Sequence, residues 1–115
     1  MMVITSAQQD DVTVISVREY LDATTSEEAT AYLSAEIDSG HTRLVMDVIR
    51  VTYLSSAGVR VIVGALREAR SSGGDVRLAV AEGNVRQVLD LAGLEQIIKI
   101  FPTAKEAVAS YATEG

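Results

Sequence analysis

Two serines and a glycine, in the stretch YLSSAGVRVI at residues 53–62, have the residue types and spacing best suited to chemistry in this chain. They lie between an apolar stretch and a segment rich in valine and isoleucine. Ser55 or Ser56 could simply cap a helix, because serine is a preferred N-cap residue. Alternatively, one of them could be a catalytic nucleophile, or it could be a site that another protein modifies.

Nucleophilic catalysis has little support in the sequence. The strand-turn-helix elbow of serine hydrolases needs a glycine two residues before the serine, and Leu54 holds that position relative to Ser56. The serine would also need a base, but the only histidine, His41, comes before the preceding apolar run. No lysine follows Gly58, so the phosphate-binding pattern of nucleotide-binding loops is missing too. We therefore expect no catalytic residue and no cofactor.

A regulatory serine fits this junction better. Phosphorylation adds a charge of about −1.5 to −2 at pH 7, and the dipole and free N–H groups at a helix N-terminus accommodate such a charge. The fold would survive, while a partner docked on the loop would meet a new dianion. A local modification would thereby act as a binding switch.

Length and composition limit the remaining classes of function. The 115 residues suit one domain spanning 1–115, and a hydrophobic content of 48% with only 4% aromatics predicts an aliphatic core. The net charge of −6 opposes binding to nucleic acid or to an anionic membrane surface. The chain has no cysteine and only one histidine, and we therefore predict no metal site. The residue pattern predicts neither a membrane span nor a signal peptide, and we expect a cytoplasmic protein.

Strand-like and helix-like segments alternate along the chain. Runs rich in β-branched and apolar residues predict strands at 12–21, 42–48, 76–80 and 96–101, with a short strand before the first. Helical spacing predicts four helices between and after them, the second with a core stripe of Val59, Ile62, Val63 and Leu66. Thr25 with Glu28, and Asn84 with Gln87, are predicted cap pairs, and Pro102 suits the first turn of the last helix.

This alternation predicts a single small α/β domain. We expect a mixed four- to five-stranded sheet with about four helices and right-handed crossovers. In such sheets, binding sites gather beyond the carboxyl ends of the strands. The serine junction follows the strand at 42–48 and is therefore expected at that edge.

The order of these pieces resembles the STAS domain, the family of anti-sigma factor antagonists and of the cytoplasmic tails of sulfate transporters. The similarity is carried by RLVMDVIRVTYLSSAGVRVIVGALREARSSGGDVRLA, and also by YLDATTSEEA and DLAGLEQIIKIFPTAKEAVAS, so it covers nearly the whole chain. It implies a STAS-like fold and a non-enzymatic protein-binding switch that takes part in transcription regulation.

The resemblance also implies partners and site residues. Antagonists of this family bind an anti-sigma factor serine kinase, a histidine-kinase-like ATPase that holds a sigma factor. The kinase phosphorylates the serine two residues before the motif glycine, here Ser56 before Gly58, and a phosphatase restores the complex. These antagonists usually carry aspartate directly before the acceptor, whereas this chain has Ser55, which is our second choice as acceptor.

Three charged residues complete the predicted partner-binding set of Asp22, Asp47, Ser55, Gly58 and Arg60. Asp22 either contacts the partner or is a turn residue, and Asp47, at an expected strand end, could organise the loop. Arg60 could meet an acidic partner or be an ordinary exposed arginine. Two other functions stay open: a constitutive STAS scaffold or accessory subunit of a transporter or signalling assembly, and a hydrolase or transferase that uses Ser56.

Overall fold

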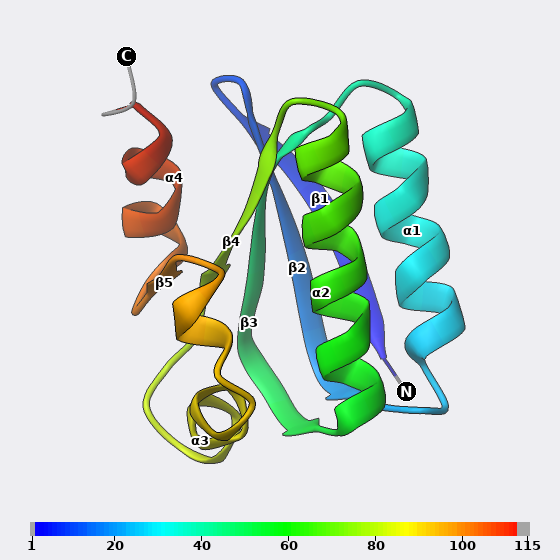
Figure 1. Ribbon diagram of the computed structural model, residues 1–115, viewed down its shortest axis with the longest axis vertical. Helices are drawn as coiled ribbons and strands as arrows, with labels where there is room; N and C mark the ends of the chain where they lie inside the picture. Colours follow the sequence, from blue (N-terminus) through cyan, green and yellow to red (C-terminus); the bar gives the residue numbers. More distant parts are fainter. Residues whose placement is uncertain (1, 113–115) are drawn as a thin grey trace.

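A five-stranded sheet and four α-helices make up the computed structural model, which describes residues 2–112 (Figure 1). The described elements, in chain order, are β1 (Val3–Gln9), β2 (Val12–Leu21), α1 (Ser26–Asp38), β3 (Arg43–Leu54), α2 (Ser56–Ser71), β4 (Asp75–Ala79), α3 (Asn84–Leu91), a 3-10 turn (Leu94–Gln96), β5 (Ile100–Phe101) and α4 (Ala104–Ala112).

The strands lie in the order β1-β2-β3-β4-β5. The first hairpin, β1 with β2, is antiparallel, and every later pair is parallel. Parallel neighbours need crossover connections, which α1, α2 and α3 provide. The prediction of a small α/β domain with a mixed sheet is confirmed.

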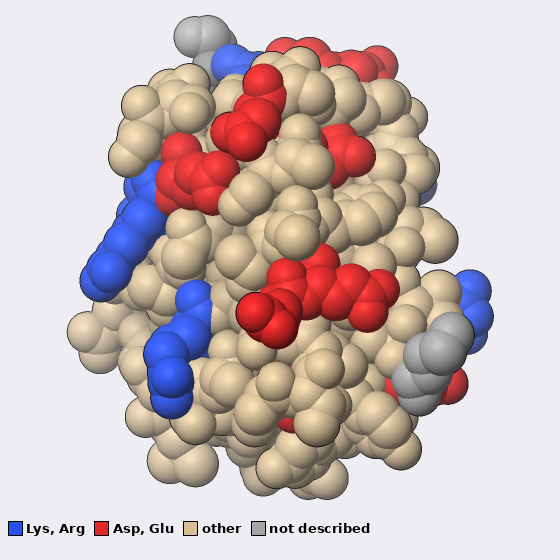
Figure 2. Space-filling model, turned by 90° about the vertical axis from the view of Figure 1, so that its right-hand side faces the viewer, with Lys and Arg blue, Asp and Glu red and all other residues tan. Residues whose placement is uncertain are grey.

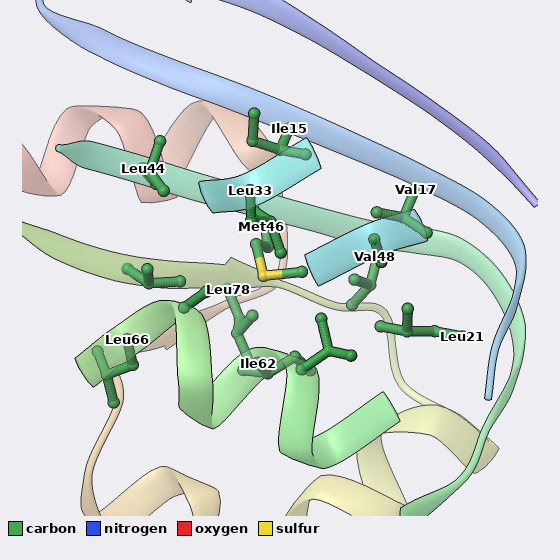
Figure 3. Close-up of a cluster of buried hydrophobic side chains, with 14 of the residues drawn as sticks. Ile15, Val17, Leu21, Leu33, Leu44, Met46, Val48, Ile62, Leu66 and Leu78 are labelled. Carbon is green, nitrogen blue, oxygen red and sulfur yellow. The ribbon is translucent and has the colours of Figure 1, made fainter. Parts of the chain in front are cut away.

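Helices cover both faces of the sheet. α1 and α2 lie side by side over one face (Figure 1), and the main core fills the space between them and the strands. Figure 3 shows this core, in which Ile15, Leu44 and Met46 from the sheet meet Leu33 of α1 and Ile62 of α2. The opposite face has a smaller cluster under α4. Among the described residues, no helix has the length and apolar character needed to cross a membrane.

β3 is longer than predicted, because it runs to Leu54 instead of stopping at residue 48. It stays paired with β2 as far as Leu21 opposite Leu54, across two irregularities in the register. Val51 and Leu54 point into the core, while Arg50 and Thr52 are exposed. The polar residues made this segment look like a loop in the sequence, although they belong to the solvent side of a strand.

The last strand is shorter than predicted. Only Ile100 and Phe101 of the expected strand 96–101 pair with β4, opposite Leu78 and Ala79. Gly93 takes a φ of 73° and turns the chain into the 3-10 segment, which occupies Leu94–Gln96. The apolar residues Ile97 and Ile98 therefore lie outside the strand.

The predicted cap pairs do not form. Thr25 precedes α1 but its hydroxyl accepts from the Asp22 N–H at 3.1 Å, so it makes no bond to the helix. Gly83, and not Asn84, is the N-cap of α3. Pro102 lies before the first turn of α4, whose Glu106 N–H is capped by the Thr103 hydroxyl at 3.1 Å.

α4 is attached to the sheet through buried polar groups. Arg77 on β4 is only 2% exposed, and its guanidinium donates to Ser110 Oγ at 2.8 Å and lies 3.9 Å from the centre of the Tyr111 ring. The Tyr111 hydroxyl lies 2.8 Å from the Leu44 carbonyl oxygen and 2.9 Å from that of Asp75, between β3 and β4. These contacts satisfy polar groups that burial would otherwise penalise.

We expect Tyr111→Phe to lower the free energy of unfolding by about 1–2 kcal/mol, because the single O–H donor that the Leu44 and Asp75 carbonyl groups share is lost. Urea denaturation of both proteins measures the difference. Tyr53→Phe is the matched control, since the Tyr53 side chain is 54% exposed, and it should change stability by less than about 0.5 kcal/mol. Equal effects of the two substitutions would contradict this account of α4.

Candidate functional site

The carboxyl ends of β2 and β3 bring two loops together. Leu21 and Leu54 are opposite each other at the ends of these strands, and the chain then continues into Asp22 and Ser55 respectively. The Leu21 carbonyl accepts the Ser55 N–H at 3.1 Å. This hydrogen bond attaches the segment of Ser55 and Ser56, which we call the serine loop, to the end of β2. Both loops lie at the lower edge of the sheet in Figure 1, where sites of open α/β sheets are found.

The two serines have different environments. Ser55 is the N-cap of α2, half-buried, and its hydroxyl accepts the Gly58 N–H at 3.4 Å. Ser56 is the first residue of the helix and is exposed, and its hydroxyl has no hydrogen bond among the described residues. The capping role and the accessible hydroxyl therefore belong to different residues, a distinction that the sequence left open.

Gly58 is required by close approach of the backbone. A Cβ atom at this position would lie 2.2 Å from the Leu21 carbonyl oxygen and 2.7 Å from Leu54 Cδ1. Neither a backbone carbonyl nor a buried leucine can retreat easily, so any side chain would push the first turn of α2 away from the sheet. The glycine two residues after Ser56 thus sets how closely the serine loop lies against β2.

Asp22 forms the turn between β2 and α1. Its carboxylate accepts the Thr24 N–H at 2.9 Å and the Thr24 hydroxyl at 2.6 Å. The hydrogen bond from the Thr24 hydroxyl is the largest influence that lowers the pKa of Asp22. Asp22 therefore has a turn role and also brings a negative charge into the loop beside the serine loop.

Asp47 does not lie at this site, and its predicted position at a strand end is wrong. It lies within β3, opposite Ser16, five residue steps of β2 before Leu21. At about 3.3 Å per residue this is roughly 16 Å along the strand. The Asp47 carboxylate accepts the Ile49 N–H at 3.1 Å, at the first irregularity of the β2–β3 register.

Arg60 lies one helical turn after Ser56 on α2. Its side chain is exposed and makes no ion pair with another described residue. It lines a groove of about 160 Å³ between α1 and α2, together with Ser34 and Glu68, which hydrogen-bond to each other at 2.8 Å. Arg60 is thus exposed one turn from Ser56, and its contact with a partner stays a prediction.

No histidine accompanies Ser56. The Nδ1 atom of His41 lies 2.6 Å from a Glu36 carboxylate oxygen, where α1 ends and β3 begins. This is the opposite end of the sheet from the serine loop, so the pair cannot activate Ser56.

The face of the molecule that α1 covers is shown in Figure 2. It has a group of acidic side chains near its middle.

Sequence reasoning missed the Leu21 carbonyl and the long β3 strand. The carbonyl acts through the backbone, so residue type carries no signal for it. The extension of β3 had a weak signal in the apolar positions Val48, Val51 and Leu54, whose spacing of three differs from the period of two expected for a strand. The irregular β2–β3 register explains that spacing.

Comparisons with known proteins agree with the fold described above. The family model of the STAS domain matches residues 4–107 of the chain. The "Putative anti-sigma factor antagonist BtrV" of Bordetella bronchiseptica is 28% identical over 112 residues, which are 97% of this chain and 97% of that protein.

Solved structures share the fold. The crystal structure of an anti-sigma factor antagonist from Mycobacterium paratuberculosis superimposes with a TM-score of 0.87 at 22% identity, over 96% of this chain and 93% of that one. The Bacillus cell fate determinant SpoIIAA in its phosphorylated form gives a TM-score of 0.68 at 22% identity, over 95% of this chain and 99% of that one.

Gly58→Ala should lower the free energy of unfolding by about 1–3 kcal/mol, because the added methyl group overlaps the Leu21 carbonyl. Gly64→Ala is the control on the same helix, where a Cβ meets nothing within 4 Å. Because alanine favours a helix over glycine, this control should instead gain about 0.5–1 kcal/mol. Thermal and urea unfolding measure both, and a harmless Gly58→Ala would contradict the close approach.

Ser55→Ala should lower the free energy of unfolding by about 0.5–1 kcal/mol, because the N-cap of α2 is lost. We expect the lower part of the usual range for a lost cap, since the hydrogen bond from the Gly58 N–H to the Ser55 hydroxyl is long. Ser56→Ala should change it by less than about 0.5 kcal/mol, since the Ser56 side chain is exposed. Urea denaturation of the two variants side by side measures the contrast. The reverse order would mean that Ser56 is the capping residue.

Proposed function

The chain belongs to the STAS domain family, and on this premise we propose that it is an anti-sigma factor antagonist whose binding is switched by phosphorylation of Ser56. The partner is an anti-sigma factor serine kinase of the histidine-kinase-like ATPase type. In its unmodified form this chain sequesters the kinase and so frees a sigma factor. Phosphorylation releases the kinase, and a phosphatase restores binding.

The exposed hydroxyl of Ser56 at the first position of α2 is the observation that carries this proposal. A kinase can reach it without unfolding the helix, because Ser55 provides the cap. The free N–H groups of the first helical turn and the helix dipole then accommodate the phosphate. Phosphorylation would therefore change the surface charge while leaving the fold in place.

Charges around Ser56 determine what a partner would meet. Asp22 is an ionised carboxylate in the adjoining loop, and Arg60 follows one turn later on α2. In the unmodified chain these offer one acidic and one basic contact beside a neutral hydroxyl. A phosphate on Ser56 would add about −1.5 to −2 charges at the start of α2, so a partner fitted to the neutral hydroxyl would meet unfavourable repulsion or desolvation.

Ser55 replaces the aspartate that antagonists usually carry before the acceptor. Serine and aspartate are both strong N-cap residues, so the substitution preserves the start of α2 and removes one negative charge. The lost charge is the observation that favours the alternative, a constitutive STAS scaffold or accessory subunit. The BtrV relative, similar over nearly its whole length, supports the antagonist instead.

The proposal predicts phosphate transfer to Ser56 when the purified chain is incubated with ATP and the histidine-kinase-like anti-sigma factors encoded in the same genome. Mass spectrometry locates the phosphate. Ser56→Ala should abolish transfer, whereas Ser55→Ala should retain it, because the acceptor hydroxyl is still present. Phosphate on Ser55 instead would move the acceptor by one residue and contradict the assignment of Ser56.

Measurements of kinase binding distinguish the phosphorylation switch from the constitutive scaffold. Ser56→Ala should bind the kinase as the unmodified chain does, and Ser56→Asp should bind at least tenfold more weakly in calorimetric titrations. Equal binding of these two variants, or a stable complex that ignores ATP, would refute the switch and favour the constitutive scaffold.

A further inference from the structure

The end of β3 has one edge without a neighbouring strand. β4 pairs with β3 only as far as Ala79 opposite Asp47, whereas β3 continues through residues 48–54 with β2 alone beside it. In Figure 1 the chain leaves β4, swings outward and returns as α3 beside this part of β3. Among the described residues, no backbone hydrogen bond joins the loop 80–83 to this edge.

A groove lies along this edge. One part, of about 290 Å³, separates Val48–Thr52 from the segment Val80–Val85. A second part, of about 240 Å³, lies between Thr52–Leu54 and the side chains of α3, including Val88. Thr52, Asn84 and Val85 line both parts, so they form one continuous channel, which we call the β3 groove.

The chemistry of the β3 groove favours a peptide over a phosphorylated metabolite. Its lining contains a single charged residue, Glu82, which disfavours an anionic ligand. An unpaired strand edge beside valine side chains is instead the arrangement to which an extended peptide adds as a further strand.

We propose that the β3 groove receives an extended segment of the kinase, added as a strand along residues 48–54. This rests on the proposed function, because the groove ends at Leu54, next to Ser55 and Ser56. A partner that covers Ser56 therefore meets the chain within two residues of the end of the groove at Leu54. The segment should carry apolar or β-branched side chains at alternate positions and no acidic residue facing Glu82.

A peptide selection tests the groove independently of any kinase. A phage-displayed library of random nonapeptides is selected on the purified chain, and the enriched peptides are synthesised and titrated. Asn84→Arg, which places a long side chain where the two parts meet, should weaken binding at least tenfold. Gln87→Arg is the matched control, since it adds the same charge on α3 and Gln87 does not line the groove.

Amide hydrogen exchange then distinguishes strand addition from other modes of contact. Bound peptide should slow the exchange of amides within residues 48–54. Ala81→Arg, in the loop wall of the first part, should repeat the loss of affinity if Asn84→Arg disturbs α3. The proposal is overturned by a library that yields no binder, by peptides insensitive to both variants, or by protection elsewhere on the chain.

The kinase provides the second arm of the test. Asn84→Arg should weaken the kinase complex at least tenfold and Gln87→Arg by less than twofold, with Ser56 unmodified in each. A kinase that binds Asn84→Arg normally would show that its contact leaves the groove empty. If no kinase binds the unsubstituted chain, the proposed function fails instead, and the peptide results still decide whether the groove binds peptides.

Discussion

The Leu21 carbonyl oxygen joins the end of β2 to the start of α2, where the two serines lie. It accepts the Ser55 N–H at 3.1 Å, and it occupies the space that a side chain on residue 58 would need. β2 and α2 can approach so closely only because residue 58 is glycine. This contact and the pairing of Leu21 with Leu54 together place Ser56 beside the Asp22 loop.

β3 is longer than the strands on either side of it, and its pairing with β2 is irregular. Between the pairs Ser16–Asp47 and Leu21–Leu54, β2 advances five residues and β3 advances seven. The two extra residues of β3 are accommodated at the irregularities of the register, where Glu19 takes a φ of 75°. β3 also continues past Asp47, where its pairing with β4 ends, so the serine loop lies at the tip of the sheet and one strand edge is left beside α3.

The serine pair separates a structural task from a chemical one. Ser55 satisfies a backbone N–H group of α2, and Ser56 presents its hydroxyl to solvent. Because the cap does not depend on Ser56, a modification of Ser56 need not disturb the helix. Serine and aspartate both cap a helix through a side-chain oxygen, so an aspartate at residue 55 could perform the same structural task.

The sequence by itself determined the fold class, the order of most elements and the serine junction as the notable site. Local patterns suffice for these, because the periodicity of apolar residues reports which side of a strand or helix is buried. Only the tertiary structure decided that β3 continues to Leu54, that Asp47 lies far from Ser56, and which serine is exposed. These depend on the irregular pairing of β3 with β2 and on the contact between Gly58 and the Leu21 carbonyl, and neither a register nor a backbone contact between distant segments is written in local residue types.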